Sequence, residues 1–335
     1  MLITDAFDRV VILNLPYKQD RKQRLAANMQ ATGIADLSKV VWQSAVSGDK
    51  MPPPAWWNAG NGAWGCLMSH VMAVQQAAID GLDSILILED DAVFDEDSAY
   101  LLSALHRQWP AQWGQIYLGG QHLGESEPAG ELWVKPANVN RTHAFALHSS
   151  AFAAFVAHIL YAPDYISRGG WHVDHQLGIA HERGDWPVFA PKWWMVGQAA
   201  GDSNISGQRN PEQWWQPIPE GYESPVFLLP DTLKNDDRLY QCYCHAGHNL
   251  YRKTCEDTGA DKALREGGGI SRFLDSIIGE ATWHHRLPCV QHPEYTKAFL
   301  KSKKWPGKVV QIKHAGEIPA LWRAFMRELR AEVLK

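Results

Sequence analysis

The sequence predicts an α/β protein organised around a parallel β-sheet. Two apolar runs, residues 10–15 and 84–88, consist mainly of aliphatic residues, as expected for strands that are covered on both faces of a sheet. A segment with helical character lies between the first run and another strand-like segment at residues 39–42. This β-α-β order predicts parallel strands that are joined by a crossover helix.

The predicted crossover helix covers residues 19–32. This stretch lacks Gly and Pro, and helical spacing places Leu25, Met29 and Thr32 on one face. Gly33 directly follows, and glycine commonly ends a helix because it adopts the left-handed conformation without strain.

A loop rich in Pro and Gly is expected over residues 48–65. Ser69 then has the side chain of a helix cap, and the helix that it begins is predicted to run to Asp80. The buried strand at residues 84–88 follows this helix.

The next part of the chain is less regular in pattern. Residues 115–118 are predicted to form a strand, and residues 144–160, rich in Ala and Phe, a helix. The polar stretch between them, residues 121–137, is expected to be a lid or a binding loop. Residues 200–225 are predicted to be irregular, with a domain boundary near their end.

Two domains are therefore expected, because 335 residues exceed what a single core usually contains. The first covers residues 1–225, and the second, residues 226–335, is a smaller accessory or acceptor-binding domain of unknown fold. The second has 18 Lys and Arg against 13 Asp and Glu, whereas the first has 14 against 24. The basic balance is either ordinary surface charge or a surface for a polyanionic acceptor, such as nucleic acid or a phosphorylated glycan.

The composition also indicates a compartment. No apolar run approaches the roughly 20 residues of a membrane span, and the N-terminus lacks the features of a secretion signal. Five cysteines in a chain of this length do not make a disulfide framework. The sequence therefore predicts a cytoplasmic protein without a membrane span.

Three carboxylates, Glu89, Asp90 and Asp91, directly follow the strand at residues 84–88. Ligands of open α/β sheets bind outside the carboxyl ends of the strands, and adjacent carboxylates repel one another unless a cation shares their charge. Mg²⁺ and Mn²⁺ prefer oxygen ligands and complete their coordination with water and phosphate oxygens. The triplet thus predicts a metal site for a nucleotide diphosphate. The alternative is a purely structural role, in which these acids cap a helix or begin a solvated turn.

Four segments match, in order, the motifs of one enzyme family. They are Val11-Ile12-Leu13-Asn14-Leu15 with Asp20-Arg21, Ala45-Val46-Ser47-Gly48, Gly62-Ala63-Trp64-Gly65-Cys66-Leu67-Met68-Ser69-His70, and Leu86-Ile87-Leu88-Glu89-Asp90-Asp91. In these segments the chain resembles glycosyltransferase family 25, which includes bacterial lipopolysaccharide glycosyltransferases and collagen hydroxylysine galactosyltransferases. Weaker matches follow at Tyr117-Leu118-Gly119, residues 142–149, Val173-Asp174 and residues 198–206, so the resemblance covers roughly residues 9–207.

The resemblance implies a GT-A type fold, a Rossmann-like sheet with helices on both faces. It also implies a nucleotide-sugar donor such as a UDP-sugar, a divalent metal ion, Mn²⁺ or Mg²⁺, and inversion at the anomeric carbon. Two departures leave the donor sugar open, since Ser47 stands where the family favours Asp and Phe145 stands near a usual Tyr.

Two catalytic tasks follow for such a transferase. A metal ion neutralises the departing diphosphate, and its expected ligand is Asp91 together with Asp90 or Glu89. A base removes the proton of the acceptor hydroxyl, and the resemblance favours Asp174 for this role. His172 and His175, its neighbours in sequence, are the alternative bases, because imidazole titrates near neutral pH.

Further residues are expected to bind the donor. Asn14, at the end of the first strand, could read a base or ribose edge, and Arg21 could pair with phosphate or carboxylate through its planar fork. Both residues could instead have a purely structural role: Asn14 could cap a turn, and Arg21 could form a surface ion pair. Ser69 and His70 begin the predicted helix, whose N-terminal amides could meet an anion. Cys66 is expected to be a small buried residue rather than a nucleophile.

The second domain contains nine Cys and His residues that could bind a structural zinc ion, although their spacing departs from paired Cys-x-x-Cys. They are Cys242, Cys244, His245, His248, Cys255, His284, His285, Cys289 and His292.

The expected acceptor is a bacterial surface glycan. A hydroxymethylated base in DNA is the second choice, because of the basic tail and the 16 tryptophans, and a protein hydroxylysine is the third. A non-catalytic module that binds glycans or nucleic acid is the alternative of a different class.

Overall fold

The structure is a computed structural model, and part of the chain is described by it. The described residues are 1–161, 165, 167, 171–205, 207, 209–210, 212–217, 226–228, 289–290, 309–311 and 318–335. The chain divides into two compact units, Met1–Asn210 and Pro211–Lys335. The predicted boundary near residue 225 stays a prediction.

The first unit is built on an eight-stranded mixed sheet with the strand order β2-β1-β3-β8-β5-β9-β7-β6. These strands are β1 (Arg9–Asn14), β2 (Val40–Ser44), β3 (Ser84–Glu89), β5 (Gln115–His122), β6 (Ser126–Pro128), β7 (Trp133–Pro136), β8 (Val139–His148) and β9 (Val188–Pro191). As the opening β-α-β pattern predicts, β1 is parallel to both β2 and β3. The sheet becomes mixed beyond β3, because β8 runs antiparallel between β3 and β5.

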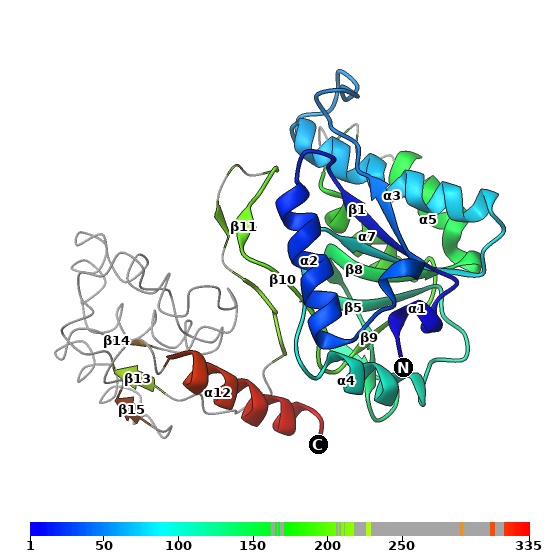
Figure 1. Ribbon diagram of the computed structural model, residues 1–335. Helices are drawn as coiled ribbons and strands as arrows, with labels where there is room; N and C mark the ends of the chain where they lie inside the picture. Colours follow the sequence, from blue (N-terminus) through cyan, green and yellow to red (C-terminus); the bar gives the residue numbers. More distant parts are fainter. Residues whose placement is uncertain are drawn as a thin grey trace. The chain divides into compact units, whose positions relative to one another are not determined.

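Helices cover both faces of this sheet, with α2 and α4 on one side and α3 and α5 on the other (Figure 1). The helices of the unit are α1 (Ile3–Ala6), α2 (Gln19–Thr32), α3 (Asn61–Ile79), α4 (Ser98–His106), α5 (Ser149–Tyr161) and α7 (Val173–Arg183), with a 3₁₀ turn η1 (Leu37–Lys39). Val11 and Leu13 of β1 belong to the core that contains α3, α5 and α7. Val10 and Ile12 are buried on the opposite face, as the alternation of a strand requires. The predicted α/β class is confirmed.

Helix α2 has the predicted bounds. Leu25 and Met29 are buried on its inner face. Gly33 follows with φ of 62°, and its N–H donates to the carbonyl oxygens of Gln30 and Met29. Glycine fits this left-handed position because it has no Cβ.

Helix α3 starts earlier than the sequence predicts, at Asn61 rather than Ser69. The predicted loop is confirmed over residues 48–60, but residues 61–65 belong to the helix, because the glycines there serve close packing instead of ending it. A Cβ on Gly65 would lie 2.4 Å from the carbonyl oxygen of Val46. Ser69 is an interior residue, and its hydroxyl donates to the carbonyl of Gly65 and accepts from the N–H of Val46.

The predicted helix over residues 144–160 was also wrong in its first part. Residues up to His148 belong to β8, and α5 begins at Ser149. Because β8 lies inside the sheet and is buried on both faces, its apolar run lacks the alternation that would distinguish a strand from a buried helix.

Residues 121–137, expected to be a loop, contribute to the sheet instead. Strands β6 and β7 form an antiparallel pair at its edge, and β7 pairs with β9. The connection is therefore mostly a β-hairpin.

Seven short strands of the described residues lie outside the main sheet, four in the first unit and three in the second. Strand β10 (Val196–Gln198) pairs with β4 (Ala92–Phe94), and β11 (Gly201–Asp202) with β12 (Arg209–Asn210). In the second unit, β13 (Val226–Leu228) pairs in parallel with β14 (Cys289–Val290) and β15 (Val309–Gln311), and α12 (Ile318–Val333) is the described helix. The side chains of the predicted zinc ligands lie outside the described residues.

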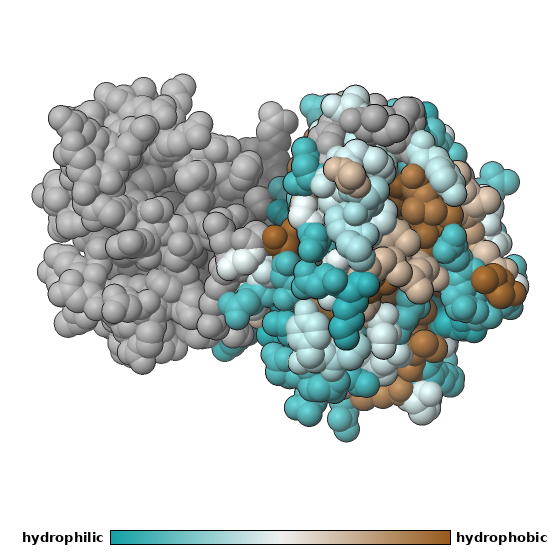
Figure 2. Space-filling view, turned by 90° about the horizontal axis from the view of Figure 1, so that it is seen from above, coloured by the Kyte–Doolittle hydropathy of each residue, from teal (hydrophilic) through white to brown (hydrophobic). Residues whose placement is uncertain are grey.

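Figure 2 shows hydrophilic residues over most of the visible face of the first unit, with smaller apolar patches between them. Within the described part of the chain, no helix has both the length and the apolar composition that a bilayer span needs.

Candidate active site

A pocket of about 490 Å³ opens at the carboxyl ends of β1 and β3. Its wall is formed by the acidic triplet, the segment after β2, the start of α3 and the segment from Gln198 to Ile205. This is the edge at which ligands of open α/β sheets bind. None of the residues 121–137, predicted as a lid, lines the pocket.

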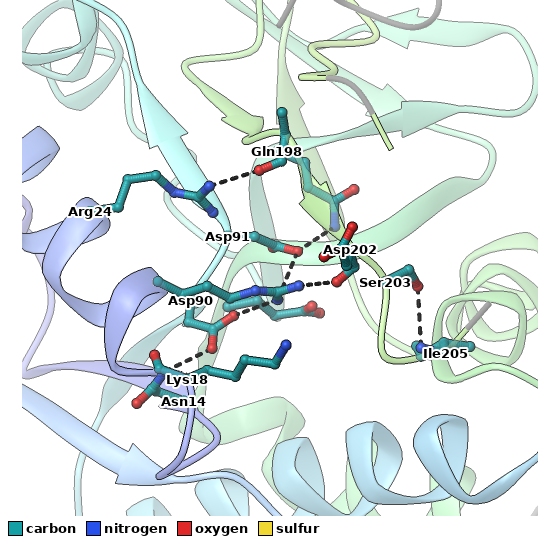
Figure 3. A network of polar contacts seen from close by, with 12 residues as sticks. Asn14, Lys18, Arg24, Asp90, Asp91, Gln198, Asp202, Ser203 and Ile205 are labelled. Carbon is teal, nitrogen blue, oxygen red and sulfur yellow. Dashed lines mark hydrogen bonds and ion pairs between the residues drawn. The ribbon is translucent and has the colours of Figure 1, made fainter. Parts of the chain in front are cut away.

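Asp90 is held from two sides by residues that the sequence singles out. Arg21 Nη1 lies 3.0 Å from Asp90 Oδ1, and Asn14 Nδ2 donates to Asp90 Oδ2 at 2.8 Å. Figure 3 shows Asn14 and Lys18 on one side of Asp90 and Asp91 on the other. Both oxygens of Asp90 are therefore engaged, and its carboxylate orients Arg21 toward the pocket.

Asp91 is less satisfied than Asp90. Its Oδ2 accepts a hydrogen bond of 3.1 Å from Gln198 Nε2 and lies 3.6 Å from Arg21 Nη1 (Figure 3). Its Oδ1 is buried and has no hydrogen-bond partner among the described residues. Burial, and next the negative charges of Glu89 and Asp90, raise the pKa of Asp91 to about 7. A buried carboxylate with an unused oxygen fits a hard divalent ion, which would supply the missing positive charge.

Glu89 points to a different part of the site. Thr142 Oγ1 donates to Glu89 Oε1 at 2.6 Å, and His70 Nε2 lies 3.6 Å from the same oxygen. Burial is the main reason that the pKa of Glu89 rises to about 7, even though the hydrogen bond from Thr142 opposes this rise.

The three acids of the triplet thus influence one another's charge but have different hydrogen-bond partners. Asp90 accepts from Asn14 and Arg21. Asp91 accepts from Gln198, and Glu89 accepts from Thr142. Asp91 is the member with an unused buried oxygen, so it is the best placed for a hard ion. The joint role of all three as metal ligands stays a prediction.

Ser69 and His70 do not begin a helix, and the prediction that their amides meet an anion was wrong. The first turn of α3 lies at Asn61 instead, and Gly60, Asn61 and Gly62 all line the pocket. The free N–H groups of a first turn attract anions. The site therefore has a helix N-terminus, but eight residues earlier in the chain.

Asp174 lies in the first turn of α7 and is not among the residues that line the pocket. Its Oδ2 accepts from the backbone N–H of Arg141 at 3.2 Å, and its Oδ1 accepts from the N–H of His175 at 3.0 Å. Arg141 has a φ of 79°, which is unusual for a residue other than glycine. The rings of His172 and His175 lie 5.6 Å apart. The role of Asp174 as base stays a prediction.

Sequence reasoning missed three contributors. Gln198 holds Asp91, Thr142 holds Glu89, and the carbonyl oxygen of Asp202 accepts from Arg21. The weak motif matches at residues 142–149 and 198–206 contain all three, but a pairwise contact across the sheet leaves no trace in a single sequence.

A model of glycosyltransferase family 25 (LPS biosynthesis protein) matches residues 56–125. No curated protein matches the sequence. Among solved structures, a glycosyltransferase involved in the glycosylation of the major capsid of PBCV-1 has 12% identity and a TM-score of 0.29, over 46% of this chain and 68% of that one. Mouse xyloside xylosyltransferase 1 has 11% identity and a TM-score of 0.33, over 53% and 81%. Structural likenesses this distant carry no argument about function.

The matched region includes two of the motif segments described above, residues 62–70 and residues 86–91. Residues of both segments line the same pocket. The match confirms the resemblance to glycosyltransferase family 25 and, with it, the prediction that this chain is a glycosyltransferase.

Proposed function

We propose that the enzyme transfers a hexose, glucose or galactose, from a UDP-sugar to a hydroxyl acceptor, with inversion and with Mn²⁺ or Mg²⁺. The observation that carries this proposal is the buried Oδ1 of Asp91, which has no hydrogen-bond partner among the described residues and belongs to the wall of the pocket. Hard divalent ions typically use one or two protein carboxylates and take phosphate oxygens as further ligands.

The donor side of the pocket supplies positive charge. A divalent ion held by Asp91 would neutralise the diphosphate as the bond to the sugar breaks. Arg21 lines the same pocket, and its guanidinium is fixed by Asp90 and by the carbonyl oxygen of Asp202. A fixed cation stabilises a departing diphosphate without having to reorganise. The amides at the start of α3 add to this on the pocket wall.

The acceptor side requires a base. In a single displacement, the acceptor oxygen bonds to the anomeric carbon while the bond from that carbon to the diphosphate oxygen breaks. The acceptor proton passes to the carboxylate of Asp174. Two backbone N–H groups, of Arg141 and His175, hold this carboxylate in place. These two hydrogen bonds fix the orientation of the Asp174 carboxylate.

A bacterial surface glycan is the proposed acceptor, in line with the description of the matching family as LPS biosynthesis proteins. Nothing in the described part of the chain favours modified DNA, a protein hydroxylysine or a non-catalytic module.

The test is nucleotide release from a panel of UDP-sugars in the presence of Mn²⁺, with and without EDTA. Asp91→Asn is expected to lose at least about 100-fold in turnover, the effect of removing a group that stabilises charge in the transition state. Glu96→Gln is the matched control, because Glu96 is an exposed acid five positions away that does not line the pocket. Activity that survives EDTA and Asp91→Asn unchanged contradicts the metal role, and a lack of turnover or binding with every donor contradicts the transferase proposal.

A further inference from the structure

A second group of metal-binding side chains lies in the wall of the same pocket. Cys66 and His70 are one helical turn apart on α3, and Glu89 ends β3. One possible ligand atom from each lies within 4.8 Å of the others, and among the residues that the structure describes this is the one group of three with that property. All three residues line the pocket, so an ion from solvent could reach them.

The hydrogen bonds of His70 leave one ring nitrogen suited to a metal. Its Nδ1 lies 2.9 Å from the carbonyl oxygen of Cys66, which fits an Nδ1–H donor. A neutral imidazole carries a single N–H, so Nε2 then presents a lone pair, although its neighbours are two further oxygens. These are Glu89 Oε1 at 3.6 Å and the carbonyl oxygen of Thr142 at 3.4 Å.

A lone pair that faces oxygen atoms is an unfavourable arrangement, so Nε2 needs either a proton or a metal cation between it and these oxygens. Histidines that bind metals almost always donate their other ring N–H to a carbonyl or carboxylate, which fixes the tautomer. The bond from His70 to the Cys66 carbonyl is of this kind. The side chain of His70 is buried in the wall of the pocket.

The ligand set selects the class of metal. Thiolate, imidazole and carboxylate together suit Zn²⁺ and similar ions, whereas Mg²⁺ and Mn²⁺ favour oxygen ligands alone. The possible ligand atoms of Cys66, His70 and Glu89 lie within 4.8 Å of one another. Zn–S and Zn–N bonds of about 2.3 and 2.0 Å require small side-chain shifts to bring such atoms to one ion.

We propose that Cys66, His70 and Glu89 form a binding site for a thiophilic divalent cation such as Zn²⁺, separate from the hard-ion site at Asp91. On binding, the S–H bond of Cys66 breaks, a sulfur–metal bond forms, and the proton passes to solvent. The pocket side of the ion keeps a position for water, because the chain supplies three ligands. A cation here occupies the wall that the donor diphosphate would use and repels the ion at Asp91, so zinc inhibits transfer. The inhibition rests on the proposed function, but the binding does not.

Cobalt binding to the full chain tests the site directly, because Co²⁺ replaces Zn²⁺ and a thiolate ligand gives it an intense charge-transfer absorption. The wild type is expected to bind one more equivalent of thiolate-ligated Co²⁺ than Cys66→Ser or His70→Gln. Comparison by difference is needed because Cys242, Cys244, Cys255 and Cys289 of the second unit are present in every variant. Met72→Ala is the matched control, since Met72 is an exposed residue of the same helix.

The outcomes are distinct. Equal cobalt spectra for the wild type and for Cys66→Ser overturn the site, provided that circular dichroism shows both to be folded. The site is also overturned if Cys66→Ser binds one equivalent of Co²⁺ less than the wild type while Glu89→Gln and His70→Gln bind as much as the wild type. The thiol would then bind the ion without the other two residues. In the transfer assay, the zinc concentration for half inhibition is expected to rise at least about tenfold in Cys66→Ser relative to Met72→Ala. If no donor is turned over at all, the cobalt result still decides the binding site.

Discussion

The guanidinium of Arg21 and the carboxylate of Asp90 form an ion pair of 3.0 Å in which each side chain is about nine-tenths buried. The pair joins α2 to the end of β3, 69 positions apart in the sequence. A buried pair that is well hydrogen-bonded is costly to break, because removal of one partner leaves the other charge uncompensated. Loss of either partner is therefore expected to lower the stability of the first unit.

Asp90→Asn is therefore expected to destabilise the first unit by about 3 kcal/mol or more. Hydrogen exchange of the β1 and β3 amides measures this, since it reports the opening of that unit. Asp80→Asn is the control, because Asp80 pairs with Arg9 at the surface, where such pairs contribute little to stability. Equal effects of the two substitutions would contradict the account of Arg21 and Asp90.

Asp91→Asn is expected to behave in the opposite way. Without metal, the buried carboxylate of Asp91 is disfavoured by burial and by its acidic neighbours, which raise its pKa to about 7. Removal of this charge at pH 8 should leave the stability of the metal-free protein unchanged or higher, while metal-dependent activity is lost. The same exchange experiment, done after EDTA treatment, checks the stability. A loss as large as that of Asp90→Asn would show that Asp91 is a structural residue.

Gly65→Ala should lower donor affinity although alanine favours helices. The new Cβ would lie 2.4 Å from the carbonyl oxygen of Val46, so the segment after β2 that lines the pocket has to move. Gln75→Ala, at an exposed position of the same helix, should leave affinity unchanged. Calorimetric titration with UDP and Mn²⁺ compares the two, and identical dissociation constants would contradict the packing argument.

The stability of the first unit is expected to depend on pH because of His181. Burial first, and then the neighbouring His158, lowers the pKa of His181 to about 3. Its Nδ1 accepts from the N–H of Val139, and its Nε2 lies 3.1 Å from Gln115 Oε1, as in a neutral ring. The unfolded state takes up a proton near pH 6.5, before the folded state does, so stability falls as pH falls from 6.5 toward 3.

The contribution of His181 is obtained as the difference in unfolding free energy between the wild type and His181→Asn. This difference should shrink by up to about 1.4 kcal/mol for each pH unit below 6.5. A difference that is the same at pH 7 and pH 5 would show that His181 is not held neutral.

The sequence predicted those parts of the fold that local patterns encode. The bounds of α2 followed from its apolar face and Gly33, and β1 and β3 from their unbroken aliphatic runs. Local patterns failed where a residue serves a distant contact. Gly65 was interpreted as part of a loop, yet it allows α3 to approach Val46. The apolar run of β8 was interpreted as a helix, because a strand that is covered on both faces shows no alternation of polar and apolar residues.

The candidate site shows the same limit. Asp91 and Arg21 could be chosen from sequence because they stand in specific motifs at strand and helix ends. Gln198 and Thr142, which hold the carboxylates, come from other strands and could not be chosen. The division of roles within the triplet also depended on three-dimensional contacts, because adjacent acids look alike in a sequence but point to different neighbours.

The central claim is that Asp91 holds a hard divalent ion for a nucleoside diphosphate. The most direct measurement is the loss of free Mn²⁺ signal in electron paramagnetic resonance on titration with the protein, with and without UDP. Wild type and Glu96→Gln are expected to bind one Mn²⁺ more tightly when UDP is present, and Asp91→Asn is expected to lose this UDP-dependent binding. UDP-dependent Mn²⁺ binding that is equally tight in Asp91→Asn would contradict the account.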